Sequence, residues 1–147
     1  MISHWKNILI CCLVILLILS NIYYLNCSQV IWYEILVGVP TMNGTGTDFS
    51  QSTPLSNKEQ IEMVLFSMLN SNMIPKPAIA DNRPSAVVWI NAPREGITYL
   101  RANVWLDRDV IVFLIENTEH IEYRVVNSTY YASQLKKILE DQINRYT

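Results

Sequence analysis

The stretch "ITYLRANVWLDRDVIVFLI", residues 97–115, decides the fold because it contains two strand-like runs around a short polar turn. In the first run, aliphatic residues alternate with residues that are polar or aromatic. One side has Leu100, Ala102, Val104 and Leu106, and the other has Tyr99, Arg101, Asn103 and Trp105. This period of two is typical of a strand with one buried face. The segment "DRD" at 107–109 predicts a tight hairpin turn, in which Asp107 and Asp109 are turn residues.

The second run, "VIVFLI" at 110–115, is apolar on both sides, so we expect it to be buried on both faces. Val110, Val112 and Leu114 are predicted to face the core, which leaves the alternate residues outside. In simple hairpin register, Tyr99 and Trp105 share that outer side. The resulting interaction patch would consist of Tyr99, Trp105, Ile111, Phe113 and Ile115. Residues 30–39, a second copy, the membrane surface or another protein could cover it.

Further elements on both sides of this hairpin predict an antiparallel meander. Ala86 to Ile90 reads as a strand, and residues 121–125 read as another, with Ile121, Tyr123 and Val125 inward. Connections this short favour antiparallel neighbours. Ser56 and Glu59 fit a capping box that opens a helix ending near Asn70. Asn127 or Ser128 caps a second helix that ends near Arg145.

These elements predict an α+β fold class. The folded domain, residues 56–147, would be a small two-layer domain of helix, four-stranded antiparallel meander and helix. Residues 28–55 would form a juxtamembrane segment and flexible linker. Within it, Val30–Pro40 could lie at the membrane interface or dock on the domain as a strand, and residues 41–55 read as a spacer.

The N-terminal stretch predicts a transmembrane helix. Ile8 to Leu25 is an almost continuous apolar stretch of 18 residues, or about 27 Å of helix, close to the thickness of a bilayer core. No Ala-x-Ala cleavage site follows it. Cys27 comes after Tyr-Leu-Asn, a poor context for lipid attachment, so lipidation at Cys27 and a cleaved signal are the less favoured alternatives. Residues 1–27 are therefore predicted to be an uncleaved membrane anchor.

The flanking charges predict the orientation and the location. Lys6 lies before the apolar stretch, and the next basic residue after it is Lys58. Basic residues near a membrane helix stay on the cytoplasmic side. We therefore expect a single-pass protein of the cell membrane, with its N-terminus in the cytoplasm and its C-terminal domain outside.

The amino-acid composition excludes several classes of partner and site. Ten basic and thirteen acidic residues follow Ser28, without a basic block, so nucleic acid is not an expected partner. No cysteine follows Cys27, which excludes a disulfide framework and a cysteine metal site in the folded domain. No cofactor motif is present, and we expect no cofactor.

Candidate catalytic residues are few. His120 lies beside Glu119 and Glu122 on the polar side of a strand, where a solvated role is more common than a catalytic one. Asp107 and Asp109 fit a turn better than a metal site. An envelope enzyme using His120 and nearby carboxylates is the alternative to the favoured prediction. The favoured function is a non-catalytic binding or accessory module of the cell envelope that acts through its sheet face, with a protein partner or by self-association.

The chain resembles a group of known proteins in its order of motifs. "LSNKEQIEMVLFSMLNS" is followed by a Pro-rich stretch, the hairpin and "NSTYYASQLKKIL". This order resembles small uncharacterised lipoproteins and membrane-anchored proteins of Gram-positive bacteria over roughly residues 50 to 140. The resemblance implies a bacterial envelope location and no known activity. A protein that neutralises a toxin acting on the envelope, as immunity proteins do, would be one form of such a module.

Overall fold

The computed structural model describes residues 10, 12–23, 33–93, 96–107, 110–116 and 121–147. The chain divides into two compact units, Met1–Ile31 and Trp32–Thr147. Each unit is described by itself.

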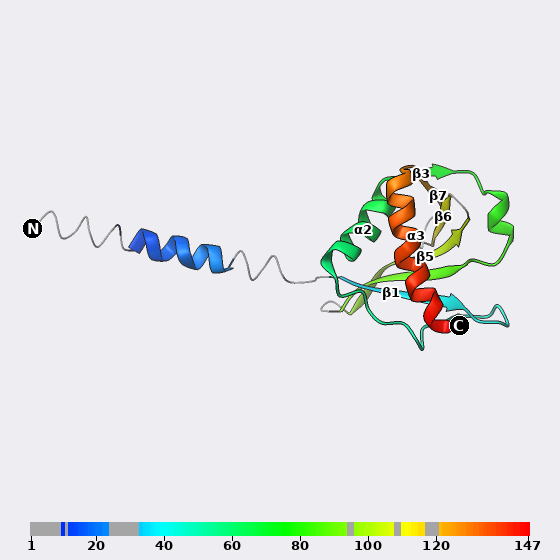
Figure 1. Ribbon diagram of the computed structural model, residues 1–147, viewed down its shortest axis with the longest axis horizontal. Coiled ribbons are helices and arrows are strands. Elements are labelled where there is room, and N and C mark those ends of the chain that lie inside the picture. The colour runs from blue at the N-terminus through cyan, green and yellow to red at the C-terminus, as the bar shows by residue number, and fades with distance from the viewer. Residues whose placement is uncertain (1–9, 11, 24–32, 94–95, 108–109, 117–120) are drawn as a thin grey trace, which may run out of the picture. The chain divides into compact units, whose positions relative to one another are not determined.

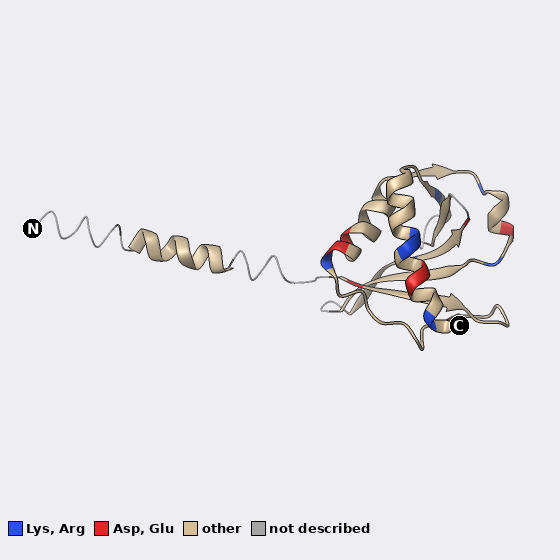
Figure 2. Cartoon of the chain, in the orientation of Figure 1, with Lys and Arg blue, Asp and Glu red and all other residues tan. Residues whose placement is uncertain are grey.

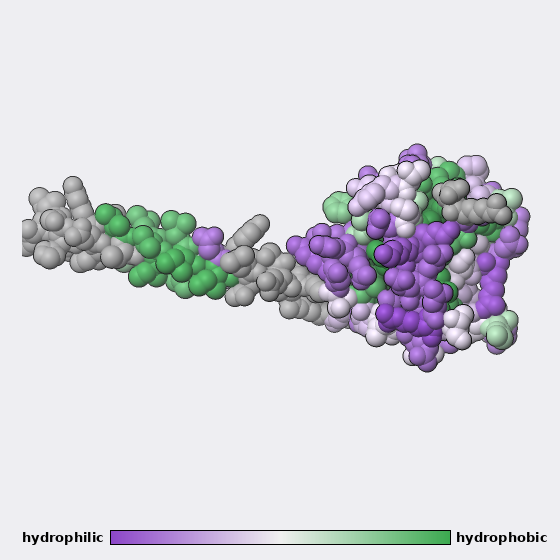
Figure 3. Space-filling model, in the orientation of Figure 1, coloured by the Kyte–Doolittle hydropathy of each residue, from purple (hydrophilic) through white to green (hydrophobic). Residues whose placement is uncertain are grey.

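The first unit contains a helix whose described residues are 10 and 12–23. Its side chains are almost all apolar (Figure 3), and Leu16 and Leu17 are 62% and 63% exposed. No helix among the described residues is long and apolar enough to cross a membrane. The predicted transmembrane helix is therefore wrong for the part of the chain that the structure describes. Residues 12–23 extend about 18 Å as a helix, against roughly 30 Å of bilayer core.

The second unit is built on a seven-stranded antiparallel sheet with the strand order β2-β1-β4-β5-β6-β7-β3 (Figure 1). Its strands are β1 (Glu34–Pro40), β2 (Thr47–Asp48), β3 (Ser71–Ile74), β4 (Ala86–Ala92), β5 (Ile97–Leu106), β6 (Ile111–Glu116) and β7 (Ile121–Val126). The four predicted strands correspond to β4 to β7. The predicted four-stranded sheet is nevertheless wrong, because β1, β2 and β3 extend it at both edges.

The segment predicted as a linker contributes to the sheet. β1 pairs with β4 along its length, which selects the docking strand from the two alternatives for Val30–Pro40. β2 pairs with the end of β1. Leu55 is 4% exposed in the core, and its N–H donates to the Ile35 carbonyl at 3.0 Å. Residues 34–55 therefore belong to the folded unit.

Two helices, α2 (Lys58–Leu69) and α3 (Thr129–Ile143), lie on one face of the sheet (Figure 1). α2 is capped by Asn57, whose side chain accepts from the Glu59 N–H at 2.8 Å, one residue after the predicted cap at Ser56. Ser128, one of the two predicted capping residues, occupies the N-cap position of α3, but its side chain makes no capping hydrogen bond. The outer surfaces of these helices are mostly hydrophilic (Figure 3), and charges of both signs are spread along α3 (Figure 2).

The hydrophobic core fills the space between these helices and the sheet. Val64 from α2 and Leu135 and Leu139 from α3 are fully buried. The sheet contributes Ile35, Val37, Ala86, Val88, Ile90, Ala102, Val104, Ile111, Phe113 and Val126. Phe113 is 0% exposed at the centre of this layer, directly opposite Val104.

The predicted faces of β6 and β7 are reversed in the structure. The β5–β6 connection includes Val110, since Leu106 pairs with Ile111 and the Asp107 N–H donates to the Val110 carbonyl. The sequence predicted a three-residue turn, whereas the connection has four residues. Directly opposite residues share a face, so one extra residue turns every β6 side chain to the other side. Ile111 and Phe113 therefore lie under the helices, while Trp105 lies opposite Val112 on the open face.

The open face of the sheet, opposite the helices, is partly covered by the Pro-rich connection that includes η1 (Ala78–Asp81). Trp105 donates from its indole N–H to the Asn82 carbonyl at 2.8 Å, and the Ser85 N–H donates to the Val104 carbonyl at 2.8 Å. Trp105 is only 5% exposed as a result. The connection from β3 to β4 thus covers Trp105, which lies opposite Val112 of β6, and Val112 is 2% exposed.

Candidate functional site: the uncovered part of the open face

Two rows of side chains cross the open face without full cover. In the first row, Arg101 on β5 lies opposite Glu116 on β6, which lies opposite Ile121 on β7. In the second row, Asn103, Leu114 and Tyr123 follow in the same order. Tyr99, 51% exposed, lies beside these rows at an irregularity of β5, where the register with β4 shifts between Leu100 and Thr98. We call Tyr99, Arg101, Asn103, Leu114, Glu116, Ile121 and Tyr123 the open-face surface.

A hollow of about 270 Å³ lies beside this surface. Its floor is formed by Val87 of β4 and by Arg101 and Asn103 of β5. One wall is formed by residues 44–46 of the connection between β1 and β2 and by Thr47 of β2. The other wall is the end of the Pro-rich connection, Arg83 and Pro84. We call this the arginine hollow.

A hydrogen bond joins the two walls of the arginine hollow. The Arg83 guanidinium donates through Nη2 to the Pro40 carbonyl at the end of β1. This acceptor is neutral, so the charge of Arg83 is not compensated by it. Among the described residues, no carboxylate lies within ion-pair distance of Arg83.

The second arginine of the hollow is only loosely paired. Arg101 Nε lies 3.8 Å from Glu116 Oε2, and the two side chains are 44% and 42% exposed. The other carboxylate oxygen of Glu116 accepts from Asn103 Nδ2 at 2.8 Å. An exposed pair at this distance contributes little to stability. Asn103 therefore orients Glu116, while Arg101 keeps donors for another acceptor.

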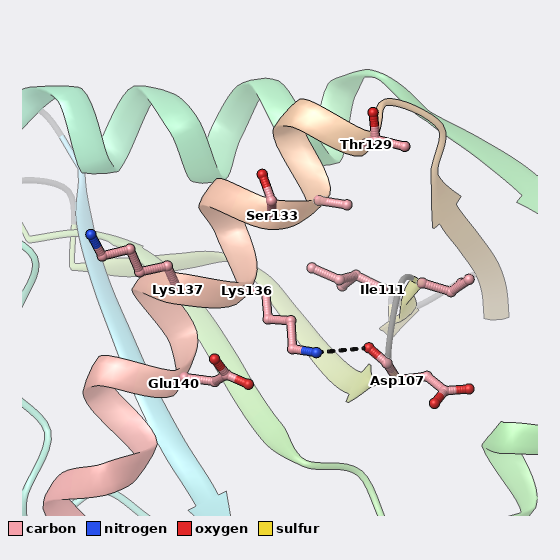
Figure 4. Close-up of a pocket in the computed structure, with 9 residues that line it drawn as sticks. Asp107, Ile111, Thr129, Ser133, Lys136, Lys137 and Glu140 are labelled. Carbon is pink, nitrogen blue, oxygen red and sulfur yellow. Dashed lines mark hydrogen bonds between the residues drawn. The ribbon is translucent and has the colours of Figure 1, made fainter.

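A second hollow, of about 210 Å³, lies on the helix side between α3 and the start of β6 (Figure 4). Ile111 and Ala132 form its apolar part, and Lys136 points toward Asp107. The Lys136 ammonium donates to the Asp107 carbonyl at 3.2 Å. Acidic and basic side chains both line this hollow, so its charge favours neither sign.

A third hollow, of about 440 Å³, lies where the end of the chain meets β1 and β2. The Tyr146 hydroxyl donates to the Val37 carbonyl at 3.2 Å. Burial raises the pKa of Tyr146, and the nearby charge of Asp48 raises it further. The pKa of Asp48 is lowered because its carboxylate accepts from the Ser50 N–H at 2.8 Å. Both groups have structural partners, so neither is poised for catalysis.

The five residues of the predicted interaction patch do not share one surface. Ile111 and Phe113 are buried beneath the helices, and Ile115 packs partly buried against the same core. Trp105 lies on the opposite face under the Pro-rich connection. Tyr99 is exposed, and its ring lies 5.4 Å from that of Tyr33 in an edge-to-face arrangement.

The candidate catalytic residues are not brought together where they are described. Glu122 Oε2 accepts from Arg124 Nη1 at 3.2 Å, while the same arginine donates to the Ser71 carbonyl at 2.8 Å. Asp107 closes the β5–β6 turn, as predicted. His120, Asp109, Glu119 and the lipidation candidate Cys27 lie outside the described residues. No group of three or more metal-binding side chains occurs within the described ranges.

Sequence reasoning missed the arginine hollow because its walls come from segments predicted to be irregular. Arg101 and Asn103 carried a signal, since both stand on the polar side of β5. Arg83 carried none, because its place depends on the path of the Pro-rich connection across the sheet. Comparison with known protein families, curated proteins and solved structures gives no match for this chain.

Proposed function

We propose that the folded unit is a non-catalytic protein-binding module of the cell envelope that acts through the open-face surface. The observation that supports this most is the mixture of charged, aromatic and aliphatic side chains on the two rows, of which the first is exposed and the second half-buried. Arginine and tyrosine are enriched in protein interfaces and dominate their binding energy. Arg101, Tyr99 and Tyr123 lie here beside Leu114 and Ile121, while the adjacent hollow offers a recess for a partner side chain.

Two variants of the open-face surface test the proposal. Tyr99→Ala and Ile121→Asp remove an exposed aromatic ring and an exposed aliphatic side chain, 51% and 73% exposed. Each has a matched control on the helix side: Tyr130→Ala, 59% exposed, and Leu69→Asp, 76% exposed. The tagged full-length chain is used for cross-linking and capture from detergent-solubilised membranes.

We expect the wild type and both controls to capture the same protein in stoichiometric amount. The two open-face variants should retain at most about a tenth of it, as expected for loss of an interface hot spot. Equal capture by all five chains would contradict the proposed surface. If the controls lost the captured protein and the open-face variants kept it, the binding surface would lie on the helix side instead.

We also propose that the apolar N-terminal stretch, residues 8–25, associates with a membrane. Its support is the row of exposed apolar side chains from Ile10 to Tyr23. The full chain should sediment with membranes in a neutral low-salt buffer, whereas a Leu16→Lys, Leu17→Lys variant should move largely to the supernatant. Recovery of the wild-type chain in the supernatant would refute the association. Ile121→Asp is the control and should stay in the pellet.

A further inference from the structure

We infer that the arginine hollow binds a carboxylate side chain from an acidic segment of the protein partner. The inference rests on the proposed function and names the chemistry that the open-face surface would recognise. It is carried by the two guanidinium groups, their weak internal pairing and the size of the hollow.

Charge is the first argument. The lining of the hollow includes Arg83 and Arg101 and no aspartate or glutamate. Two carboxylates lie outside this lining: Glu116 is beside Arg101, and Asp48 lines the third hollow, which Arg83 also lines. The chain as a whole has a formal net charge of −2, so this positive site stands out locally. A site of this kind attracts a negative group at short range.

Unused hydrogen-bonding capacity is the second argument. A guanidinium has five N–H donors in a planar fork that matches a carboxylate. The described interactions of Arg83 include one donor bonded to the Pro40 carbonyl. Those of Arg101 include the 3.8 Å approach to Glu116. Both side chains therefore have donors to offer without breaking a bond of the fold.

Size and position select the occupant. About 270 Å³ is below the usual range for nucleotide or cofactor sites, and it accommodates one or two side chains. Arg101 and Asn103 belong both to the floor of the hollow and to the open-face surface. A partner that covers Tyr99 and Leu114 would thus place a neighbouring acidic side chain over Arg101. A protein segment fits this continuity better than a free small anion.

Four variants of the full-length chain in mild detergent test the inference: Arg83→Gln, Arg101→Gln, Arg101→Lys and Lys137→Gln. Arg83→Gln and Arg101→Gln each remove one guanidinium from the hollow. Lys137→Gln removes the same charge from an exposed position on α3 and serves as the control. The probe is a fluorescently labelled hexaglutamate peptide, with hexaglutamine as its uncharged counterpart, and the readout is fluorescence anisotropy at low ionic strength.

We expect the wild type and Lys137→Gln to bind hexaglutamate equally and hexaglutamine not at all. Each arginine variant should bind hexaglutamate about tenfold more weakly, because one charge-assisted hydrogen bond contributes roughly that factor. Arg101→Lys should lose part of the affinity, since it keeps the charge and loses the fork. If thermal unfolding shows that an Arg101 variant is not folded, the result for Arg83→Gln decides, because Arg83 is exposed and its substitution should leave the fold intact.

Three results would overturn the inference: no binding of hexaglutamate by the wild type, an equal loss in Lys137→Gln, or displacement of the peptide by an equal concentration of inorganic phosphate. The last result would identify a free phosphate as the ligand instead. The variants Tyr99→Ala and Ile121→Asp test the proposed function independently of the carboxylate site. If they abolish partner capture while hexaglutamate does not bind, the binding surface stands and only the carboxylate site is wrong.

Discussion

Replacing Phe113 with alanine is expected to lower the free energy of unfolding by about 3–5 kcal/mol, the usual cost of truncating a fully buried phenylalanine. Phe113 is 0% exposed and lies opposite Val104 in the layer covered by α2 and α3. The cavity left behind cannot close easily, because the neighbouring side chains come from a hydrogen-bonded sheet. Urea unfolding followed by tryptophan fluorescence measures the change.

Leu114→Ala is the matched control for Phe113→Ala. Leu114 is the next residue of β6, is partly buried, and lies on the open face opposite Asn103. Its truncation should cost about 1 kcal/mol, because it loses less buried surface. If Leu114→Ala proved the more damaging of the two, the faces of β6 would be those predicted from the sequence.

The comparison between Phe113 and Leu114 also shows where prediction from the sequence fails. The alternation of Leu100, Ala102, Val104 and Leu106 identified the core side of β5 correctly, because the opposite side carries Arg101 and Asn103. β6 offered no such contrast, since both of its sides are apolar. Its faces could be assigned only from the length of the turn.

Because this turn is one residue longer than predicted, the side chains of both following strands lie on the opposite faces from those predicted. With Leu106 opposite Ile111, Phe113 moves to the helix side. β7 pairs with β6, so Arg124 moves to the helix side with Phe113, and Tyr123 moves to the open face with Leu114. A single residue in one connection thus reversed two strands, as the period of two requires. This reversal replaced the predicted apolar patch with the open-face surface.

The helices were predicted better than the sheet edges, for a local reason. Capping residues and a stripe of apolar residues lie within the helix itself, so the sequence signals for α2 and α3 did not depend on distant contacts. Leu69 is an exception, because it continues the apolar spacing of Ile61, Val64 and Met68 and yet is 76% exposed. The helix turns Ser67 toward the core instead, where its hydroxyl donates to the Met63 carbonyl at 2.6 Å.

β1 and β3 depend on partners far away in the sequence, and β2 pairs only with β1. β1 pairs with β4 about fifty residues later, and β3 pairs with β7 at a similar separation. Nothing in residues 41–55 signals burial by composition, since threonine, serine and glycine dominate there. The arginine hollow combines this segment with the Pro-rich connection, so it could not be found before both were placed.

The close contact between β1 and residues 48–49 leads to the second large effect. We expect Gly38→Ala to lower the free energy of unfolding by about 2–3 kcal/mol, the cost of an extra group in a packed site. A Cβ at Gly38 would lie 2.6 Å from the Asp48 carbonyl oxygen and 2.7 Å from a ring carbon of Phe49. The Phe49 ring is itself held against Trp89, with 4.5 Å between ring centroids.

Gly46→Ala is the control for Gly38→Ala, because its Cβ would meet nothing closer than 3.9 Å. It should change stability by less than about 0.5 kcal/mol, as surface substitutions do. Adding Phe49→Ala to Gly38→Ala should not restore the wild-type stability, since the Asp48 carbonyl belongs to the backbone of β2 and cannot rotate away. Equal unfolding midpoints for Gly38→Ala and Gly46→Ala would show that residues 48–49 do not pack on β1.

Gly38→Ala also tests how the wall of the arginine hollow is held. β2 is attached to the sheet through Val39 and Pro40, the two residues that follow Gly38. Pushing Asp48 and Phe49 outward would therefore displace Thr47 and the Pro40 carbonyl that Arg83 binds. We expect the folded fraction of Gly38→Ala to bind hexaglutamate more weakly than the wild type does, although the substitution removes no charge. Unchanged affinity in a destabilised Gly38→Ala chain would show that the guanidinium groups bind without support from β2.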